Sequence, residues 1–396
     1  MSTLIGIGVS SSDDVQRAAR EATQLAKFQI NQERFDLVIV FSSVRVGQEK
    51  IIAGINQVVP GVKIFGCSTA SVIVHSGIEK NAVAVMAIKS DRIHFGLSCL
   101  PEIDTKDARS AGQELAKAAL ADLGYFHRNI FTMFSDGLMG NATEVIAGVQ
   151  DVLGKSFLFI GGAASDDLRF VKTYQYFNEE CFTNSAIGLL WGGDIHYGFG
   201  IQHGWKPIGK TRTVTLSEAN VIKRIDDAPA VTLYQDYFGP ETKSLYSSRL
   251  ARTAALYPLG IFLEEEQEHI LRCVTTVNED GSLICQGDVP QGSLVRLMIG
   301  SKDACIQAAR EAAQEAKEML RGKQPKFIMV IDSVARNKVL QANSFAEIEV
   351  IQAVFDKSVP LLGFYSYGEG APLKTRGYQG QAYFHNGVIA VLAIAE

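Results

Sequence analysis

Apolar stretches alternate along the chain with amphipathic stretches, a pattern typical of strands and helices packed in layers. Residues 15–26 place their apolar side chains on one stripe at helical spacing. Ser12, Asp13 and Asp14 precede this stripe and supply the cap and acidic first turn that a helix favours. Residues 35–41 are apolar without alternation, which indicates a strand covered on both faces. The pattern therefore predicts a mixed α/β (α+β) fold in which sheets are layered with helices.

The chain also repeats itself. The segment AAREATQLAK at 18–27 shares eight of ten residues with AAREAAQEAK at 308–317, and the same offset aligns 35–43 with 325–333. Each of these regions is followed by a strand that runs into glycine and then by a strand opened by asparagine: 62–67 and 361–365, then 81–88 and 386–394. A repeat of this length predicts a fold built from related units.

A third, looser copy lies between these two. It has a helix over 107–123, strands over 130–136 and 157–161, and a final strand over 184–190. Each unit thus has the order strand, helix, strand, helix, strand, strand. We predict three related units with an insert between the second and third, because residues 194–291 do not match the repeat.

This repeat pattern predicts two domains. The expected boundaries are residues 1–215 for the first domain, with units at 1–90 and 91–193, and residues 216–396 for the second, with the insert to about 291 and the third unit at 293–395. Within the insert, the alternation over 211–216 predicts a strand and the pattern over 227–238 predicts a helix.

Composition and charge narrow the class of protein. The chain has 396 residues, 47% of them hydrophobic, and a net charge of −5 without a basic run, which argues against a nucleic-acid partner. Its apolar stretches are shorter than the ~18 residues of a membrane-spanning helix, and the N-terminus lacks the basic region of a secretory signal. The six cysteines form no CxxC pair, as expected for reduced thiols. We therefore expect a cytoplasmic protein without membrane insertion.

Several motifs occur in the order found in one known family. They are GCSTA at 66–70, FSDGLMGN at 134–141, GGAAS at 161–165, HGWKPIG at 203–209, GFYSYGE at 363–369 and FHN at 384–386. With these motifs the chain resembles the FIST family, with a FIST N and a FIST C domain. The segment VIDSVAR at 330–336 departs from the family pattern, because many members carry a cysteine before the alanine-arginine pair.

The resemblance implies a sensory, ligand-binding protein in signal transduction and not an enzyme. Stand-alone bacterial members of the family bind b-type haem, sense nitric oxide and regulate a partner histidine kinase, which suggests a role in a two-component system. The partners expected on this basis are nitric oxide or another small ligand, a histidine kinase or other signalling protein, and a second copy of the chain in a homodimer.

Haem iron needs an axial donor inside an apolar pocket, and histidine is the commonest one. His203 is the first candidate for the iron ligand, because it follows an aromatic strand and precedes Gly204 and Trp205, and Trp205 is expected in the same cofactor site. His385, just before the last strand, is the second candidate. His196 lies seven positions before His203, so the two rings fall on opposite faces of a strand and do not share one iron. A hydrogen-bonded structural histidine is the alternative interpretation of both candidates.

A second hypothesis keeps the sensor and replaces haem with a small polar metabolite such as an amino acid. Ser135, Asp136, Gly162 and Glu369 would form its site, since each is expected at the end of a strand. Ser135 and Asp136 could instead belong to the turn before a capped helix. Glu369 could contact a ligand or Arg376, and the sequence leaves this open.

One further match concerns nucleotides. Residues 204–211, GWKPIGKT, satisfy the phosphate-loop pattern, but a working loop opens a helix and the alternation from residue 211 predicts a strand. We therefore interpret the match as chance. Cys67 has no histidine or aspartate placed beside it by sequence, so we expect a buried structural thiol and no catalytic group.

Overall fold

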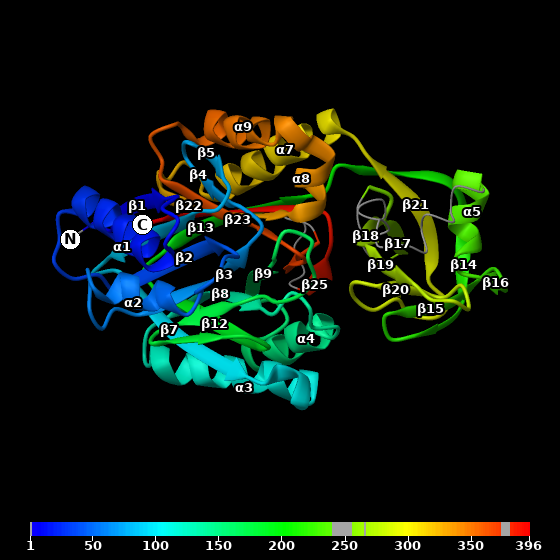
Figure 1. Ribbon diagram of the computed structural model, residues 1–396, viewed down its shortest axis with the longest axis horizontal. Coiled ribbons are helices and arrows are strands. Elements are labelled where there is room, and N and C mark those ends of the chain that lie inside the picture. The colour runs from blue at the N-terminus through cyan, green and yellow to red at the C-terminus, as the bar shows by residue number, and fades with distance from the viewer. Residues whose placement is uncertain (1, 240–255, 265–266, 374–380) are drawn as a thin grey trace.

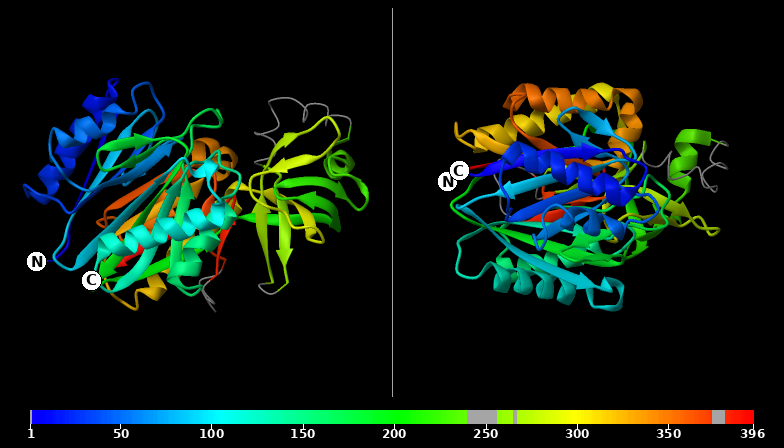
Figure 2. Two further views of the ribbon diagram at one scale, coloured as in Figure 1. Left: turned by 90° about the horizontal axis from the view of Figure 1, so that it is seen from below. Right: turned by 60° about the vertical axis from the view of Figure 1, so that its left-hand side comes forward.

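The computed structural model describes residues 2–239, 256–264, 267–373 and 381–396, and it has the predicted mixed α/β fold. Three six-stranded sheets form the main body, and an eight-stranded sheet forms a lateral domain beside it (Figure 1). The helices lie on the outer faces of the three sheets, and the sheets face one another inside (Figures 1 and 2).

Each of the three sheets is built mainly from one repeat unit. The first sheet has the order β1 (Leu4–Ser10), β6 (Val83–Lys89), β2 (Leu37–Ser43), β3 (Ile64–Thr69), β10 (Gln175–Phe177) and β11 (Glu180–Phe182). The second has the order β25 (Ala382–His385), β24 (Glu369–Pro372), β9 (Leu158–Ala163), β8 (Arg128–Ser135), β12 (Ser185–Gly193) and β7 (Ile93–Pro101). The third has the order β13 (His196–Gln202), β26 (Ile389–Ala395), β22 (Pro325–Ser333), β23 (Leu361–Ser366), β4 (Val72–Val74) and β5 (Gly77–Glu79).

The three units exchange hairpins in a ring. Hairpin β4–β5 of the first unit pairs with β23 of the third, hairpin β10–β11 of the second pairs with β3 of the first, and hairpin β24–β25 of the third pairs with β9 of the second. In every sheet the central parallel pair is flanked by antiparallel strands. The exchange ties the units together, because none completes its own sheet.

The helices cover the sheets unit by unit. The first unit has α1 (Val15–Ile30) and α2 (Lys50–Asn56), the second has α3 (Ala108–Leu123) and α4 (Ala142–Leu153), and the third has α7 (Lys302–Met319), α8 (Val334–Leu340) and α9 (Phe345–Phe355). A short 3-10 helix, Ile103–Thr105, precedes α3, and another, Gln341–Asn343, follows α8. The predicted cap of α1 is confirmed, because the Asp14 carboxylate accepts a hydrogen bond from Arg17 N at 2.7 Å.

Between the sheets lies one apolar core. Phe41 stacks on Phe364 with ring centroids 4.4 Å apart, and Phe65 stacks on Phe134 at 4.6 Å. Trp191 is fully buried in the same core and donates its indole N–H to the Thr132 hydroxyl at 2.9 Å. This interior is filled by side chains, so ligand sites have to lie at the ends and edges of the sheets.

The lateral domain is inserted within the third unit, between its first strand β13 and its first helix α7, and not between the second and third units as the sequence pattern predicted. Strand β13 pairs with β26 as β1 pairs with β6, so it takes the same place in its sheet. The sheet of the lateral domain comprises β18 (Glu268–Arg272), β17 (Leu259–Leu263), β21 (Leu294–Gly300), β14 (Trp205–Glu218), β15 (Val221–Ile225), β20 (Leu283–Cys285), β19 (Val274–Val277) and β16 (Ala228–Pro229), with helix α5 (Thr232–Phe238) beside it.

The predicted strand over 211–216 is confirmed as part of β14, but the helix predicted over 227–238 begins only at Thr232. Asp226 and Asp227 have φ values of 49° and 63°, which turn the chain, and β16 follows them. Because β14 continues as a strand from Trp205 to Glu218, the match over 204–211 opens no helix and is not a phosphate loop.

Candidate functional site: a cleft beside the lateral domain

The three residues that the sequence singled out for a cofactor meet at one place. His203, Trp205 and His385 line a cleft of about 750 Å³ at the junction of the third unit with the lateral domain. The lateral domain supplies Lys206 and Glu268 to its walls. The opposite wall is formed by the end of β13 and by α7 as far as Glu315, including Gln202, Asp303, Gln307, Glu311 and Glu315. We name this cavity the acidic cleft.

His203 is held by the backbone that follows it. Its Nδ1 accepts hydrogen bonds from the N–H groups of Gly204 and Trp205, both at 3.0 Å, so in the neutral ring the proton is on Nε2. Nε2 lies 3.7 Å from Oε1 of Glu268. Gly204 has a φ of 107°, and a Cβ there would lie 2.9 Å from the carbonyl oxygen of Ala304, so the turn requires glycine.

His385 is a buried structural residue. Its Nε2 lies 2.9 Å from the carbonyl oxygen of Ala371, to which the neutral ring donates. Burial lowers the pKa of its imidazole to about 3, so the ring stays neutral. Trp205 is also structural: it packs with Leu271 of the lateral domain and donates its indole N–H to Leu256 O at 3.3 Å.

These residues do not fit a haem. A haem iron binds an imidazole nitrogen that carries no proton. To bind iron through Nε2, His203 would have to move its proton to Nδ1 and lose both backbone hydrogen bonds. In His385, Nε2 carries the proton that is donated to the carbonyl oxygen of Ala371. The cleft is also lined by four carboxylates, Glu268, Asp303, Glu311 and Glu315, where a haem needs apolar walls. Within the described residues, no three histidine, cysteine or acidic side chains gather as a metal site.

The second predicted set is brought together only in part. Gly162 and Glu369 are direct cross-strand partners in β9 and β24. Ser135 and Asp136 are buried at the end of β8, where the Asp136 carboxylate accepts backbone hydrogen bonds from Leu138 at 2.7 Å and from Asn184 at 2.8 Å. These bonds hold the turn before α4, but the capped helix of the structural interpretation is not found, because the Asn141 side chain makes no capping hydrogen bond.

Glu369 is fully buried, and burial raises the pKa of its carboxyl to about 8. It contacts the Ser366 hydroxyl and accepts a hydrogen bond from Val388 N at 3.3 Å. Ser366 lines a cavity of only about 30 Å³ beneath the lateral domain, which has room for water and not for an amino acid. Arg376, the other candidate partner of Glu369, lies outside the described residues.

The raised pKa of Glu369 predicts a pH-dependent stability. Between the unfolded pKa of ~4.3 and the folded value of about 8, the folded state holds a proton that the unfolded state lacks. Stability from this group is therefore complete below the unfolded pKa and is lost as the pH rises towards 8. We expect Glu369→Gln to remove this loss, so that the difference in unfolding free energy between variant and wild type grows by at most ~1.4 kcal/mol per pH unit.

Urea unfolding at several pH values between 5 and 9 measures this difference directly. Glu114→Gln, at an exposed position on α3, is the control and should follow the wild type throughout. Parallel curves for wild type and Glu369→Gln would contradict the prediction.

Sequence analysis did not identify the carboxylates of the acidic cleft. A signal was present, because Asp303, Gln307, Glu311 and Glu315 recur every four residues and so share one face of α7. This polar stripe runs beside the buried alanines of the same helix. Glu268 could not be placed beside them from sequence, because it belongs to the lateral domain.

The architecture is that of a multidomain protein. A core of three α/β units carries an inserted sheet domain, and the acidic cleft lies where the two meet. Residues 36–228 match the FIST N domain, and residues 230–372 match the FIST C domain. The chain therefore belongs to the family of proteins that carry these two domains. FIST domains are associated with sensory signalling and ligand binding.

Individual relatives add little about activity. The uncharacterized protein MJ1623 of Methanocaldococcus jannaschii is 25% identical over 342 residues, which cover 81% of this chain and 64% of that protein. A cyanuric acid hydrolase structure aligns over 100% of both chains with a TM-score of 0.38 and 10% identity. The structure of the cyanuric acid hydrolase from A. caulinodans aligns over 100% of this chain and 99% of the hydrolase chain, with a TM-score of 0.39 and 7% identity. Such low scores support no conclusion about activity.

In the part of the chain that the structure describes, no helix has both the length and the apolar character needed to cross a bilayer.

Proposed function

We propose that this protein is a ligand-binding sensor whose acidic cleft takes a small metabolite with an amino group, such as a basic amino acid. The observation that carries the proposal is the lining of the cleft, in which four carboxylates stand against one lysine, Lys206. An ammonium group is the natural counterpart of such a surface, and Lys206 is available for the carboxylate of an amino acid. Glutamine side chains at 202 and 307 add neutral hydrogen-bonding groups.

The two walls of the cleft suggest how binding could be signalled. Glu268 and Lys206 come from the lateral domain, whereas Asp303 and Glu311 come from α7 of the third unit. A ligand that contacts both walls favours the orientation of the lateral domain that brings the walls together. The change in population between the two orientations can be no larger than the ligand's difference in affinity for them allows. A partner that contacts only one orientation would then respond to the ligand. The family resemblance suggests a histidine kinase as this partner.

Calorimetric titration of the full chain with L-lysine, L-arginine, putrescine and L-glutamate tests the proposal. We expect the basic compounds to bind and L-glutamate not to bind. Asp303→Asn and Glu311→Gln should each weaken binding about tenfold, the effect of losing ~1.4 kcal/mol of charge interaction. Glu318→Gln is the matched control, because Glu318 is on the same helix and does not line the cleft.

Two results would overturn the proposal. One is equal binding of L-glutamate and L-lysine, or binding that neither cleft variant changes. The other is saturable one-to-one uptake of hemin with a sharp Soret band that is lost in His203→Ala, which would establish the haem sensor instead.

A further inference from the structure

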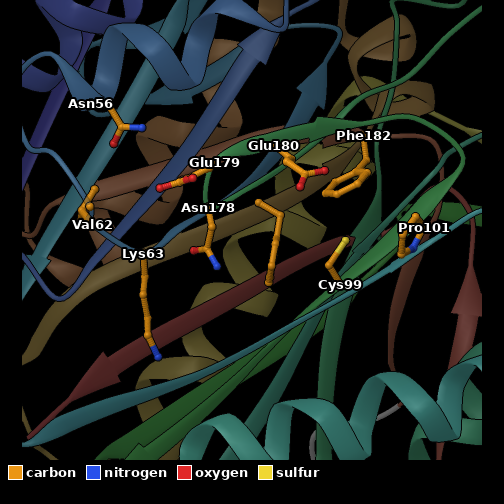
Figure 3. A pocket seen from close by; sticks show the side chains of 11 residues that line it. Asn56, Val62, Lys63, Cys99, Pro101, Asn178, Glu179, Glu180 and Phe182 are labelled. Carbon is orange, nitrogen blue, oxygen red and sulfur yellow. The ribbon is translucent and has the colours of Figure 1, made fainter.

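A second cleft lies at the junction of the first two sheets, between the edge strand β11 of one and the edge strand β7 of the other. Its volume is about 620 Å³. Figure 3 shows the side chains that line it. Cys99 and Pro101 of β7 form one side, the hairpin residues Phe177–Glu180 and Phe182 form the other, and Asn56, Gly61, Val62 and Lys63 complete it. We name it the edge cleft. The acidic cleft occupies the corresponding junction between β25 and β13, where His385 and Gln202 meet.

Side chains cap part of the open edge of β1 and part of the open edge of β7. In β1, the N–H of Ile7 donates to Oε1 of Gln29 at 2.9 Å, and its carbonyl oxygen accepts from Nε2 of the same side chain at 2.7 Å. In β7, the Phe95 carbonyl oxygen accepts from Lys63 at 2.8 Å, and the Leu97 N–H donates to Asp122 at 2.8 Å. Such contacts prevent unwanted strand pairing at an exposed edge.

Side chains cap the open edge of β7 at Phe95 and Leu97 but not at Cys99. Residues 95, 97 and 99 lie two apart in a regular antiparallel register with β12, so the Cys99 N–H and carbonyl also point away from β12. No hydrogen-bond partner for either group is found among the described residues, and Cys99 lines the edge cleft. Asn56 adds a shielded side-chain oxygen, Oδ1, that likewise has no partner within the described part of the chain.

The rim of the edge cleft is acidic on the hairpin side. Glu179 and Glu180 are exposed at the hairpin turn, and Glu180 lies beside Phe182 (Figure 3). Phe177 lines the same cleft. Lys63 offers no opposing free charge, because its ammonium group is held by Asp122 at 2.7 Å and by Phe95 O.

We infer that the edge cleft binds an extended peptide segment of a partner protein by strand addition to β7. The peptide backbone pairs with the open N–H and carbonyl of Cys99, its alternate apolar side chains pack on Phe177 and Phe182, and a basic side chain lies beside Glu179 and Glu180. Pro101 has no N–H, so the added ladder is short and the side-chain contacts set the specificity. This inference is independent of the ligand proposed for the acidic cleft.

Fluorescence polarisation with three labelled hexapeptides tests it on the full chain: basic VKVKVK, acidic VEVEVE, and VKVKVK with alternate backbone nitrogens methylated. We expect the basic peptide to bind and the acidic one not to bind. Methylation of the register that faces β7 should weaken binding at least tenfold, because it removes backbone donors without changing the side chains. The Cys99 amide resonance should shift on binding in a nitrogen–proton correlation spectrum.

Variants of the protein complete the test. Cys99→Pro removes an outward-facing N–H, so it takes no donor from the pairing of β7 with β12, and it should weaken binding at least tenfold, whereas Cys99→Ser keeps the N–H and should bind as the wild type. Glu179→Lys with Glu180→Lys should reverse the preference between the two peptides, and Glu114→Lys, outside the cleft, should not. Asp303→Asn in the acidic cleft should leave peptide binding unchanged.

Absence of binding by the basic peptide, equal binding of its methylated form, or binding without a shift of the Cys99 amide would each overturn the inference. The methylated peptide is tested on the unaltered protein, so the result does not depend on whether Cys99→Pro folds.

Discussion

Replacing Arg336 with methionine is expected to lower the free energy of unfolding by about 3–5 kcal/mol, the cost of removing one partner from a buried ion pair. Arg336 is fully buried, and its Nε lies 3.0 Å from Oδ1 of Asp332. Its Nη2 also pairs with the buried carboxylate of Glu347. Without the guanidinium, two acidic side chains remain in the interior with no counter-charge.

The same side chain joins elements that are distant in sequence. Nη1 of Arg336 donates to the carbonyl oxygen of His203 at 2.8 Å, and Nη2 donates to that of Cys305 at 2.8 Å. These bonds fix both chain segments that lead into and out of the lateral domain. The variant should therefore also change the acidic cleft, which contains His203.

The destabilisation should depend on pH. Burial, followed by the charge of Glu347, raises the pKa of the Asp332 carboxyl well above its usual range. A group with a raised folded pKa stabilises the fold below its unfolded pKa, and this stabilisation is lost as the pH rises. A protonated Asp332 carboxyl tolerates the loss of Arg336 better than an ionised one, so the cost of Arg336→Met should be smaller at pH 5 than at pH 8.

Urea unfolding at these two pH values measures the effect. Arg17→Met is the control, because Arg17 forms an exposed ion pair with Glu21 on α1 and its loss should leave the unfolding midpoint unchanged. The double variant Arg336→Met with Glu347→Leu should recover part of the stability, since it removes one of the stranded charges. Equal midpoints for Arg336→Met and wild type would contradict the prediction.

Gly200→Ala is expected to destabilise the protein by ~3 kcal/mol or more, because it forces an added methyl group into a closely packed contact. A Cβ at Gly200 of β13 would lie 2.0 Å from the carbonyl oxygen of Ala312 on α7. The first unit has the same contact, since a Cβ at Gly8 of β1 would lie 2.0 Å from the carbonyl oxygen of Ala22 on α1. Backbone of the helix cannot rotate away as a side chain can, so the strand has to move.

Thermal and urea unfolding of Gly200→Ala compare this cost with that of Gly140→Ala. A Cβ at Gly140 would have its nearest neighbour, Nδ2 of Asn220, 4.0 Å away, so that variant should unfold like the wild type. If both variants lost the same stability, the close contact between β13 and α7 could not be the cause.

The close contacts of strand glycines with helix alanines in the first and third units also have a signal in the sequence. The matching decapeptides at 18–27 and 308–317 located α1 and α7, and the buried alanines of α1 lie on the stripe predicted over 15–26 and have counterparts on α7. The pairs of glycines at 6 and 8 and at 198 and 200 are the other half of this repeat, since each pair lies beneath its helix. Their spacing was present in the sequence and would have identified β13 as the first strand of the third unit.

The candidate sites were predicted less completely. His203, Trp205 and His385 were selected separately, and the structure places them in one cleft. Their chemistry could not be predicted, because the protonated nitrogen of each imidazole is decided by partners at Gly204, Trp205 and Ala371. The edge cleft had no sequence signal, since it depends on where the capping of β7 stops.

The sequence by itself therefore determined the local elements and their repetition, because helical stripes, apolar strands and caps depend on neighbours within one or two turns. The tertiary structure alone decided the exchange of hairpins, the burial of Arg336 among carboxylates and the position of both clefts. Each of these depends on pairing between segments that are far apart in the chain. Such pairing is selected by the packing of the whole core and leaves no periodic pattern in any one segment.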